Sequence, residues 1–273
     1  MKKGKKIIIG IIVALLVVVL VGYIYLFTGS KIKNVSNDVI KGEEGTKSLV
    51  IYFTRQGEIP GNVDAVSSAT QNSNEGMDGS DTEATARMIQ SLTGADLYQI
   101  YTEHYYRKSF AGTAATAWIE EQLNLRPKLA AKPDNLDDYD TIYVGYPIWW
   151  FNAPMAIGSF LESYDLSGKT IVPFCTSQDN DISVSMDYIK EVASGANVLD
   201  GYRIHGADVD DVKEWLQRIG VLNDNNTENQ NAEGSLEMKT KKSDKNYESA
   251  TIPDELEYIP DAVSYTHLTL PTT

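Results

Sequence analysis

The stretch that decides the fold is residues 141–154, TIYVGYPIWWFNAP. It begins with Thr141–Gly145, a short apolar and β-branched run typical of a strand buried on both faces of a parallel sheet. The remainder, Tyr146–Pro154, places three aromatic residues side by side at the end of that strand. Such a cluster is costly to expose, and flat aromatic faces suit stacking on a planar ligand. Structural packing is the alternative role, and we expect it for one of Trp149 and Trp150.

The rest of the chain alternates between strand-like and helix-like segments on both sides of this stretch. Strands are predicted at 48–53, 95–100, 141–145, 169–175 and 197–204, and helices at 82–92, 111–123, 155–161, 182–192 and 209–219. This alternation predicts right-handed β-α-β crossovers and a doubly wound parallel sheet. Such sheets bind ligands beyond the carboxyl ends of their strands, where the strand order switches.

A second candidate loop, residues 54–58 (TRQGE), follows the first predicted strand directly. An insert at 59–79 separates it from residues 80–83 (SDTE), where Ser80 and Glu83 have the spacing of a capping box at a helix start. Hydroxyls and backbone N–H groups at a helix N-terminus suit a phosphate dianion. An ordinary polar turn is the alternative reading. The insert is positioned to cover a ligand bound at this loop.

A third candidate loop, residues 176–181 (TSQDND), follows the fourth predicted strand. Its amides and hydroxyls could contact a polar ring edge. The neighbouring Cys175 is the only cysteine of the chain, and no His or Lys lies near it in sequence to activate it, so we expect a small buried hydrophobic residue.

Charge and composition exclude several classes of function. The formal net charge is −14, and the acidic residues are concentrated after residue 45, which argues against a broad nucleic-acid-binding face. One cysteine and three widely spaced histidines give no metal-ligand pattern, so no metal site is expected. No Ser-His-Asp or Cys-His arrangement is apparent either, and we expect no catalytic side chain.

The N-terminus carries a candidate membrane segment. Ile7–Phe27 is an apolar run of the length that spans a hydrocarbon core of about 30 Å, and Lys2, Lys3, Lys5 and Lys6 precede it. The positive-inside bias predicts a single-pass signal anchor in the cell membrane, with a cytoplasmic N-terminus and an extracytoplasmic domain. A cleaved signal peptide is the alternative, although Tyr25-Leu26-Phe27 supply no small residues for cleavage.

These observations divide the chain into five parts. We expect a basic cytoplasmic segment at 1–6, the anchor at 7–27, a polar tether at 28–46, one α/β domain at 47–222 and a disordered tail at 223–273. Within the tail, residues 261–273 resemble translated adapter sequence and are assigned no function.

Four stretches of the domain, 49–57, 82–100, 139–154 and 167–177, resemble bacterial flavodoxins. The run Gly145–Trp150 followed by Ala153-Pro154 is similar to one flavodoxin branch in particular, as are residues 93–97 and 167–170. The resemblance implies a five-stranded parallel sheet of order 2-1-3-4-5 with helices on both faces, and flavin mononucleotide (FMN) as the cofactor. The implied cofactor-binding residues are Thr54, Arg55, Gln56, Gly57, Asp81, Thr82, Pro147, Ile148, Trp149, Trp150, Phe151, Asn152, Thr176, Ser177, Gln178 and Asp179.

The chain departs from the flavodoxin pattern in two of the three loops. The usual Gly-Asn-Thr-Glu segment reads Ser80-Asp81-Thr82-Glu83, and Gln178–Asp181 stand where glycines are usual. An aspartate in the first of these loops lacks an amide donor and is expected to repel a phosphate by ~1 kcal/mol or more.

The sequence therefore favours an FMN-binding electron-transfer protein tethered to the membrane, which exchanges electrons with a redox partner protein or a small acceptor. Two alternatives remain open: an FMN-dependent NAD(P)H:quinone or acceptor oxidoreductase, and a degenerate flavodoxin-like binding module without flavin. An extracytoplasmic domain without a basic patch is poorly suited to NAD(P)H, which disfavours the first alternative.

Overall fold

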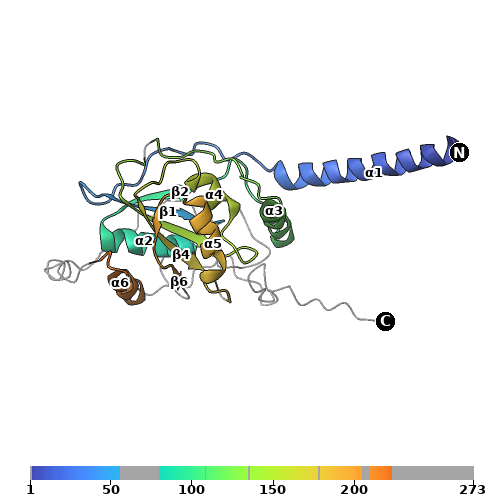
Figure 1. The fold of residues 1–273 in the computed structure, drawn as a ribbon. Helices are drawn as coiled ribbons and strands as arrows, with labels where there is room; N and C mark the ends of the chain where they lie inside the picture. The colour runs from blue at the N-terminus through green and yellow to red at the C-terminus, as the bar shows by residue number, and fades with distance from the viewer. Residues whose placement is uncertain are drawn as a thin grey trace, which may run out of the picture.

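The fold is drawn in Figure 1, from a computed structural model that describes residues 2–55, 80–107, 109–134, 136–177, 179–204 and 209–222. Three predicted site residues, Gln56, Gly57 and Gln178, lie outside the described residues, as do the insert at 59–79 and the predicted disordered tail.

The described strands form one sheet. They are β1 (Ser48–Phe53), β2 (Asp96–Ile100), β3 (Thr141–Pro147), β4 (Thr170–Thr176), β5 (Asn197–Val198) and β6 (Tyr202–Ile204). Their order is β2-β1-β3-β4-β5, β6 also pairs with β4, and every pairing between these strands is parallel. The predicted doubly wound sheet of order 2-1-3-4-5 is confirmed.

The prediction of one continuous fifth strand at 197–204 is wrong, because the structure has two short strands there, β5 and β6. β5 pairs with Thr170 and Ile171 of β4, whereas β6 pairs with the segment from Phe174 to Thr176. Between these two pairings lies Pro173, which has no backbone N–H to donate to a neighbouring strand. The gap between β5 and β6 therefore lies opposite the part of β4 that is least able to form backbone hydrogen bonds with a neighbouring strand.

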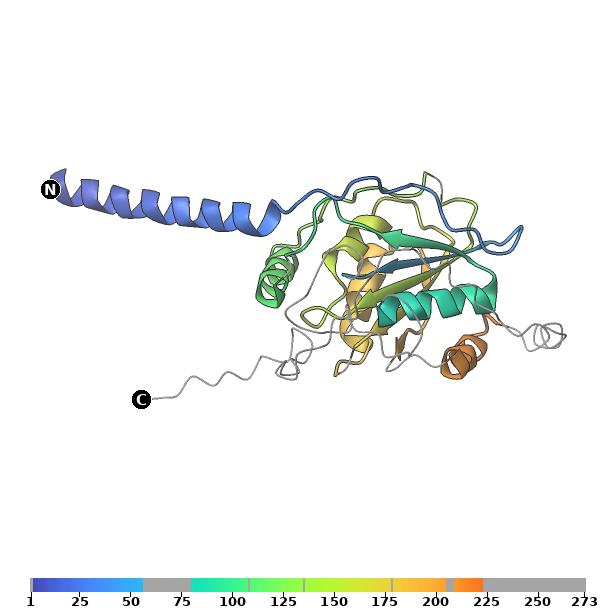
Figure 2. The ribbon, with the colours of Figure 1, turned by 180° about the vertical axis from the view of Figure 1, so that it is seen from behind.

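Helices cover both faces of the sheet (Figure 2). They are α2 (Asp81–Thr93), α3 (Phe110–Gln122), α4 (Met155–Leu161), α5 (Ser183–Val192) and α6 (Val209–Arg218), each within one residue of its predicted bounds at either end. One buried cluster joins α4 and α5 to the sheet and includes Phe160 and Ile189. A second buried cluster joins α2 and α6 to the opposite face and includes Ile89 and Trp215.

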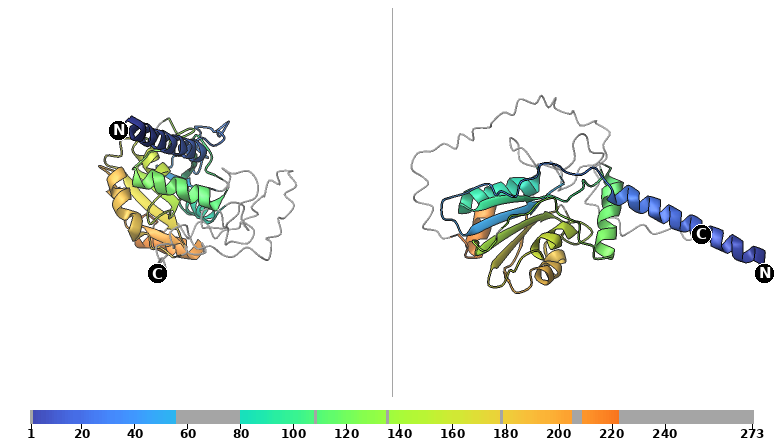
Figure 3. Two further views of the ribbon diagram at one scale, coloured as in Figure 1. Left: turned by 90° about the vertical axis from the view of Figure 1, so that its right-hand side faces the viewer. Right: turned by 90° about the horizontal axis from the view of Figure 1, so that it is seen from above.

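The first helix, α1 (Lys2–Phe27), projects away from the domain (Figure 3). Its 22 residues from Lys6 to Phe27 are long and apolar enough to cross a membrane, and none of the most apolar stretch is buried within the protein. A signal sequence meets the same criteria of length and composition.

The segment at 28–46, expected as a polar tether, has contacts of its own with the domain. It runs antiparallel to β2, with Lys31 bridged to His104 and Ile40 bridged to Leu97. Lys41 forms an ion pair of 2.8 Å with Asp96. Burial of the Asp96 carboxyl opposes ionisation, but hydrogen bonds from Lys41, Tyr139 and the Gly42 amide outweigh it and lower the Asp96 pKa.

This pairing places α1 with respect to the sheet. Because Lys31 lies beside His104, which follows the end of β2, the C-terminal end of α1 lies near the carboxyl ends of the strands. The helix that can enter a membrane therefore joins the domain at the edge where doubly wound sheets bind their ligands.

Candidate functional site

A cluster of buried hydroxyl groups lies where β1 and β4 end and α2 begins. The Thr54 and Ser80 hydroxyls are 2.6 Å apart, and the Thr82 and Thr176 hydroxyls are 2.7 Å apart. None of these four side chains is more than 1% exposed. Two of them, Thr54 and Thr82, were predicted as site residues in the phosphate loop, and Thr176 was predicted in the third loop.

The position of α2 explains this arrangement. Ser80 is its N-cap, and the Ser80 hydroxyl accepts a hydrogen bond of 3.3 Å from the Glu83 amide. The first-turn N–H groups of a helix have no acceptor within the helix and carry its partial positive charge. Ser80 was absent from the predicted site residues, although its capping-box spacing was the signal that could have identified it.

This donor set fits a phosphate monoester. Four buried hydroxyls surround the N-terminus of a 13-residue helix, which is a site suited to an oxyanion. Asp81 lies in the first turn of α2, between Ser80 and Thr82 in sequence, and is only 6% exposed. The carboxylate is compatible with the helix dipole, but it works against a phosphate in the same place.

Arg55, expected beside the phosphate, has a different contact. Its Nη2 donates a hydrogen bond of 2.7 Å to the backbone carbonyl of Arg107, and the side chain is 3% exposed. The Arg107 guanidinium in turn lies 4.1 Å from the centre of the Tyr25 ring in α1. The loop after β1 is thus connected through Arg107 to the end of α1.

The aromatic loop after β3 is shorter than expected. Tyr146 and Pro147 continue β3 and pair with Cys175 and Thr176, so the prediction that the loop begins at Tyr146 is wrong by two residues. Continued pairing with β4 keeps these residues in the sheet. The loop then forms a tight turn in which Trp149 and Asn152 exchange two backbone hydrogen bonds, of 2.8 and 3.0 Å.

The three aromatic side chains of this loop have different surroundings. Trp149 is 8% exposed and packs edge-on against Phe53 and Tyr106, with ring centres 5.4 and 5.1 Å apart. Trp150 is partly buried and donates from Nε1 to the Ala114 carbonyl of α3 at 2.8 Å. Phe151 is 42% exposed. Trp149 therefore has the packing role, and Phe151 is the ring most available to a ligand.

The turn holds two of these aromatic residues in a strained conformation. The φ angles of Trp150 and Phe151 are +51° and +61°, in the left-handed region that favours glycine or asparagine. Residues held in such conformations cluster at functional sites. We therefore infer that the aromatic side chains at these two positions have a functional role, which would explain why the strained backbone is kept.

Replacing Phe151 by glycine is expected to stabilise the cofactor-free protein by ~1 kcal/mol while weakening flavin binding. Glycine relieves the strained φ, but it removes the exposed ring that we expect to contact the flavin. Urea denaturation of the cofactor-free protein and a flavin titration measure the two effects separately. Unchanged flavin affinity in Phe151→Gly would contradict the role assigned to the ring.

The loop after β4 begins at the same edge of the sheet, next to the end of β3. The Ser177 hydroxyl is buried and accepts a hydrogen bond of 2.9 Å from the Asn180 amide, whereas Asp179 is exposed. Asp181 accepts from the Ser183 amide at 2.9 Å, and this contact with the start of α5 lowers the Asp181 pKa. Cys175 is fully buried, as expected from the sequence.

The structure thus gathers Thr54, Thr82, Thr176 and Ser177 with the aromatic turn at one edge of the sheet. No cluster of three or more His, Cys, Asp or Glu side chains that could hold a metal ion occurs within the described ranges. Residues 76–219 match the family model of the flavodoxins, which is more than half of the chain.

The chain belongs to the flavodoxin family. The family match agrees with the predicted fold and with FMN as the cofactor, and the hydroxyl cluster described above is suited to the phosphate of FMN. No curated protein sequence matches the chain significantly.

Three solved structures are similar to this flavodoxin-family chain. A protein of Bacteroides eggerthii DSM 20697 assigned as a flavoprotein is 28% identical, over 63% of this chain and 97% of its own, with a TM-score of 0.51. One of Bacteroides uniformis ATCC 8492 is 30% identical, over 64% and 99%, also with a TM-score of 0.51. A flavoprotein of Lactobacillus acidophilus NCFM in complex with FMN is 21% identical, over 62% and 97%, with a TM-score of 0.44.

Proposed function

We propose that the chain is an FMN-binding electron-transfer protein held at a membrane by α1. The observation that carries the proposal is the cluster of four buried hydroxyls at the start of α2, next to an aromatic turn that exposes Phe151. When bound, FMN supplies the one- and two-electron chemistry that no side chain of this site offers.

The residues of the chain have separate roles in this proposal. The hydroxyls of Thr54, Thr82 and Thr176 and the first-turn amides of α2 hold the phosphate. Phe151 and Trp150 lie against the ring, and Ser177 lies at its polar edge. Trp149 positions the turn through its contacts with Phe53 and Tyr106.

The direction of the redox effect follows from charge. The chain has a net charge of −14, and Asp81 lies in the first turn of α2, the helix whose N-terminus is proposed to hold the phosphate. Negative charge and apolar surroundings both disfavour an anionic reduced ring. The potential of the semiquinone/hydroquinone couple of the bound flavin is therefore expected to lie below that of the same couple in free FMN.

The proposal also includes an orientation of the chain in the membrane. The four lysines that precede the apolar stretch favour a cytoplasmic N-terminus, which leaves the flavodoxin domain on the extracytoplasmic side. A redox partner protein or a small acceptor would then exchange electrons with the flavin at the membrane surface.

A reduction experiment separates this function from an NAD(P)H-dependent oxidoreductase. The FMN-loaded full chain in detergent is mixed anaerobically with NADH, with NADPH or with dithionite, and its flavin absorbance is followed. We expect dithionite to bleach the flavin and the nicotinamides to leave it oxidised on the same timescale. Rapid bleaching by either nicotinamide would instead establish the oxidoreductase.

A further inference from the structure

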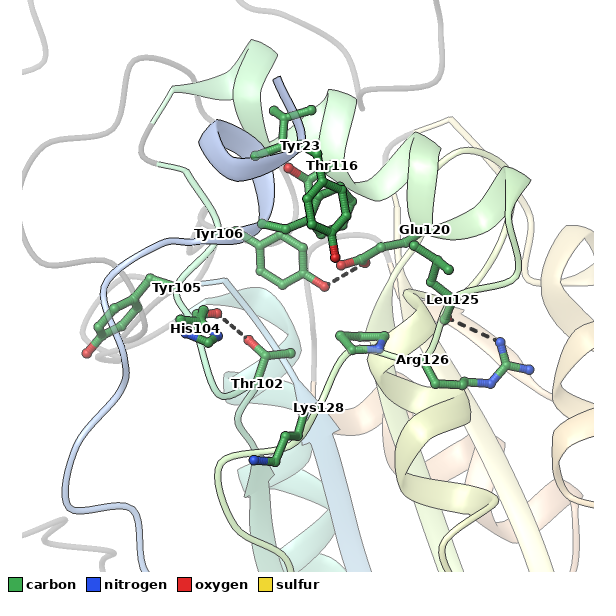
Figure 4. Close-up of a pocket in the computed structure, with 13 residues that line it drawn as sticks. Tyr23, Thr102, His104, Tyr105, Tyr106, Thr116, Glu120, Leu125, Arg126 and Lys128 are labelled. Atoms are coloured by element: carbon green, nitrogen blue, oxygen red, sulfur yellow. Dashed lines mark hydrogen bonds between the residues drawn. The ribbon is translucent and has the colours of Figure 1, made fainter. Parts of the chain in front are cut away.

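A cavity of about 300 Å³ lies between the end of α1 and the domain (Figure 4). Its walls include Tyr23, Leu26 and Phe27 of α1, Tyr106 of the loop after β2, and Thr116 and Glu120 of α3. Among the described lining residues, seven of thirteen are aromatic or aliphatic, and Glu120 supplies the carboxyl group. None of its lining residues belongs to the flavin-binding set derived from the sequence.

Glu120 is the unusual member of this lining. It is 4% exposed, and its carboxyl group accepts a hydrogen bond of 2.8 Å from the Tyr106 hydroxyl. Burial raises the pKa of Glu120 to about 7, and the Tyr106 hydrogen bond opposes this rise. The group can therefore hold and release a proton near neutral pH, as general acids do.

Tyr106 connects the cavity to the flavin side of the molecule. Its hydroxyl reaches Glu120, while its ring packs against Trp149 with the ring centres 5.1 Å apart. Trp149 begins the aromatic turn that contains Trp150 and Phe151. A continuous set of aromatic contacts thus leads from the cavity to the turn beside the flavin.

The cavity also lies where a membrane ligand can reach it. Three of its residues belong to the last turns of α1, the helix long enough to span a membrane. The bridge between Lys31 and His104 keeps this end of α1 beside the carboxyl ends of the strands. A molecule dissolved in the bilayer could enter along α1 without crossing the domain.

We propose that this cavity binds the head group of a membrane-soluble quinone, and that Glu120 delivers the protons as the quinone is reduced. The inference rests on the proposed electron-transfer function and names its small acceptor. A planar ring with carbonyl oxygens matches aromatic walls and a protonated carboxyl donor. The polar rim of the cavity, which includes Arg126 and Lys128, would also suit an anionic lipid head group, but a lipid leaves the buried acid without a role.

The reaction balances in electrons and protons. The quinone takes two electrons from the reduced flavin and two protons through Glu120, and leaves as a quinol. For each proton, the O–H bond of the Glu120 carboxyl breaks and one forms at a quinone oxygen, after which Glu120 is reprotonated from water. The protons carried by the reduced flavin pass to water as it returns to the oxidised state.

The test compares two acceptors on the full chain in phosphatidylcholine nanodiscs. The FMN-loaded protein is reduced anaerobically with dithionite and mixed with decylubiquinone or with ferricyanide, which accepts electrons without protons. We expect Glu120→Gln to slow oxidation by decylubiquinone about 100-fold and to leave oxidation by ferricyanide unchanged. Glu121→Gln, the neighbouring residue that does not line the cavity, is the matched control and should match the wild type with both acceptors.

The pH profile gives a signature that a purely structural role would not produce. The other titratable and charged groups that line the cavity are Tyr23 of α1, His104, Tyr105 and Tyr106 of the loop after β2, and Arg126 and Lys128 after α3. Because Glu120 must be protonated to act, the wild-type rate should fall as pH rises through about 7. Tyr106→Phe removes the hydrogen bond that lowers the Glu120 pKa, so the fall in rate should move to higher pH. The rate of Glu120→Gln should show no such fall.

Binding to the FMN-free chain is measured separately by quenching of tryptophan fluorescence with decylubiquinone. Saturable quenching that Thr116→Leu weakens would support the cavity as the site. Loss of that quenching in nanodiscs of phosphatidylglycerol would mark a lipid head-group site and overturn the inference. Equal decylubiquinone rates for Glu120→Gln and wild type would also overturn it.

The two acceptors also separate the failure of this inference from failure of the proposed function. If ferricyanide oxidises the reduced flavin but decylubiquinone does not, the quinone site is rejected. The proposed electron-transfer function is then still supported. Absence of bound flavin would instead reject the proposed function, together with the inference that depends on it.

Discussion

Replacing Thr82 by valine is expected to weaken FMN binding by about 10- to 100-fold. Valine preserves the branched shape of threonine, so the buried packing at the start of α2 is retained. The substitution removes a hydroxyl that lies 2.7 Å from that of Thr176, within the cluster assigned to the phosphate. A hydrogen bond to a charged group contributes about 1.5–3 kcal/mol, which corresponds to the expected loss of affinity. Titration of the full chain with FMN, followed by flavin fluorescence, measures the change.

Thr85→Val provides the matched control for this prediction. Thr85 lies one turn further along α2, is fully buried, and donates its hydroxyl hydrogen bond to the Asp81 carbonyl at 2.9 Å. It shares the residue type, helix and burial of Thr82 but is bonded within its own helix. We expect Thr85→Val to bind FMN nearly as well as the wild type. Equal losses of affinity in the two variants would mean that the effect comes from α2 stability and not from phosphate contact.

Replacing Gly145 by alanine is expected to destabilise the domain by about 3 kcal/mol. Gly145 lies in the middle of β3, and a Cβ atom placed there would lie 2.1 Å from Cζ of Phe174 on the neighbouring strand β4. Phe174 is fully buried in the cluster under α2 and α6, so its ring has little room to move. Urea denaturation monitored by circular dichroism measures the loss.

A second substitution tests whether the clash is the cause. Phe174→Leu shortens the side chain opposite position 145 and is expected to be destabilising alone, since it leaves a cavity. Combined with Gly145→Ala, the total loss should be smaller than the sum of the two single losses, because the added methyl group occupies the vacated space. Strictly additive losses would show that the Phe174 ring does not determine the glycine at this position.

Most of the fold was predictable because its signals are local. Buried parallel strands read as continuous apolar runs, and helix starts such as Ser80 carry capping residues. The split of the fifth strand was not predictable from its own residues, because it stands opposite Pro173 in another strand. The docking of residues 28–46 on β2 was missed for a similar reason, since the anchoring carboxyl of Asp96 is more than fifty residues away in sequence.

The candidate site was predictable in its loops but not in the orientation of its side chains. The sequence indicated the aromatic turn, yet only the structure separates the packed Trp149 from the exposed Phe151. Tyr106 was not predicted at all, because its contacts with Trp149 and Glu120 join three segments that no sequence spacing relates. Contacts of this kind depend on how the segments pack together, which periodicity and motifs do not encode.

The central claim is that this chain binds FMN, and an absorbance spectrum tests it most directly. The full chain, purified in detergent, is incubated with FMN and then freed of excess cofactor by gel filtration. We predict that the protein fraction retains flavin absorbance bands, with fluorescence quenched by the aromatic turn. A colourless fraction that is folded by circular dichroism would contradict the account, and would indicate that the altered phosphate and third loops have abolished the cofactor site.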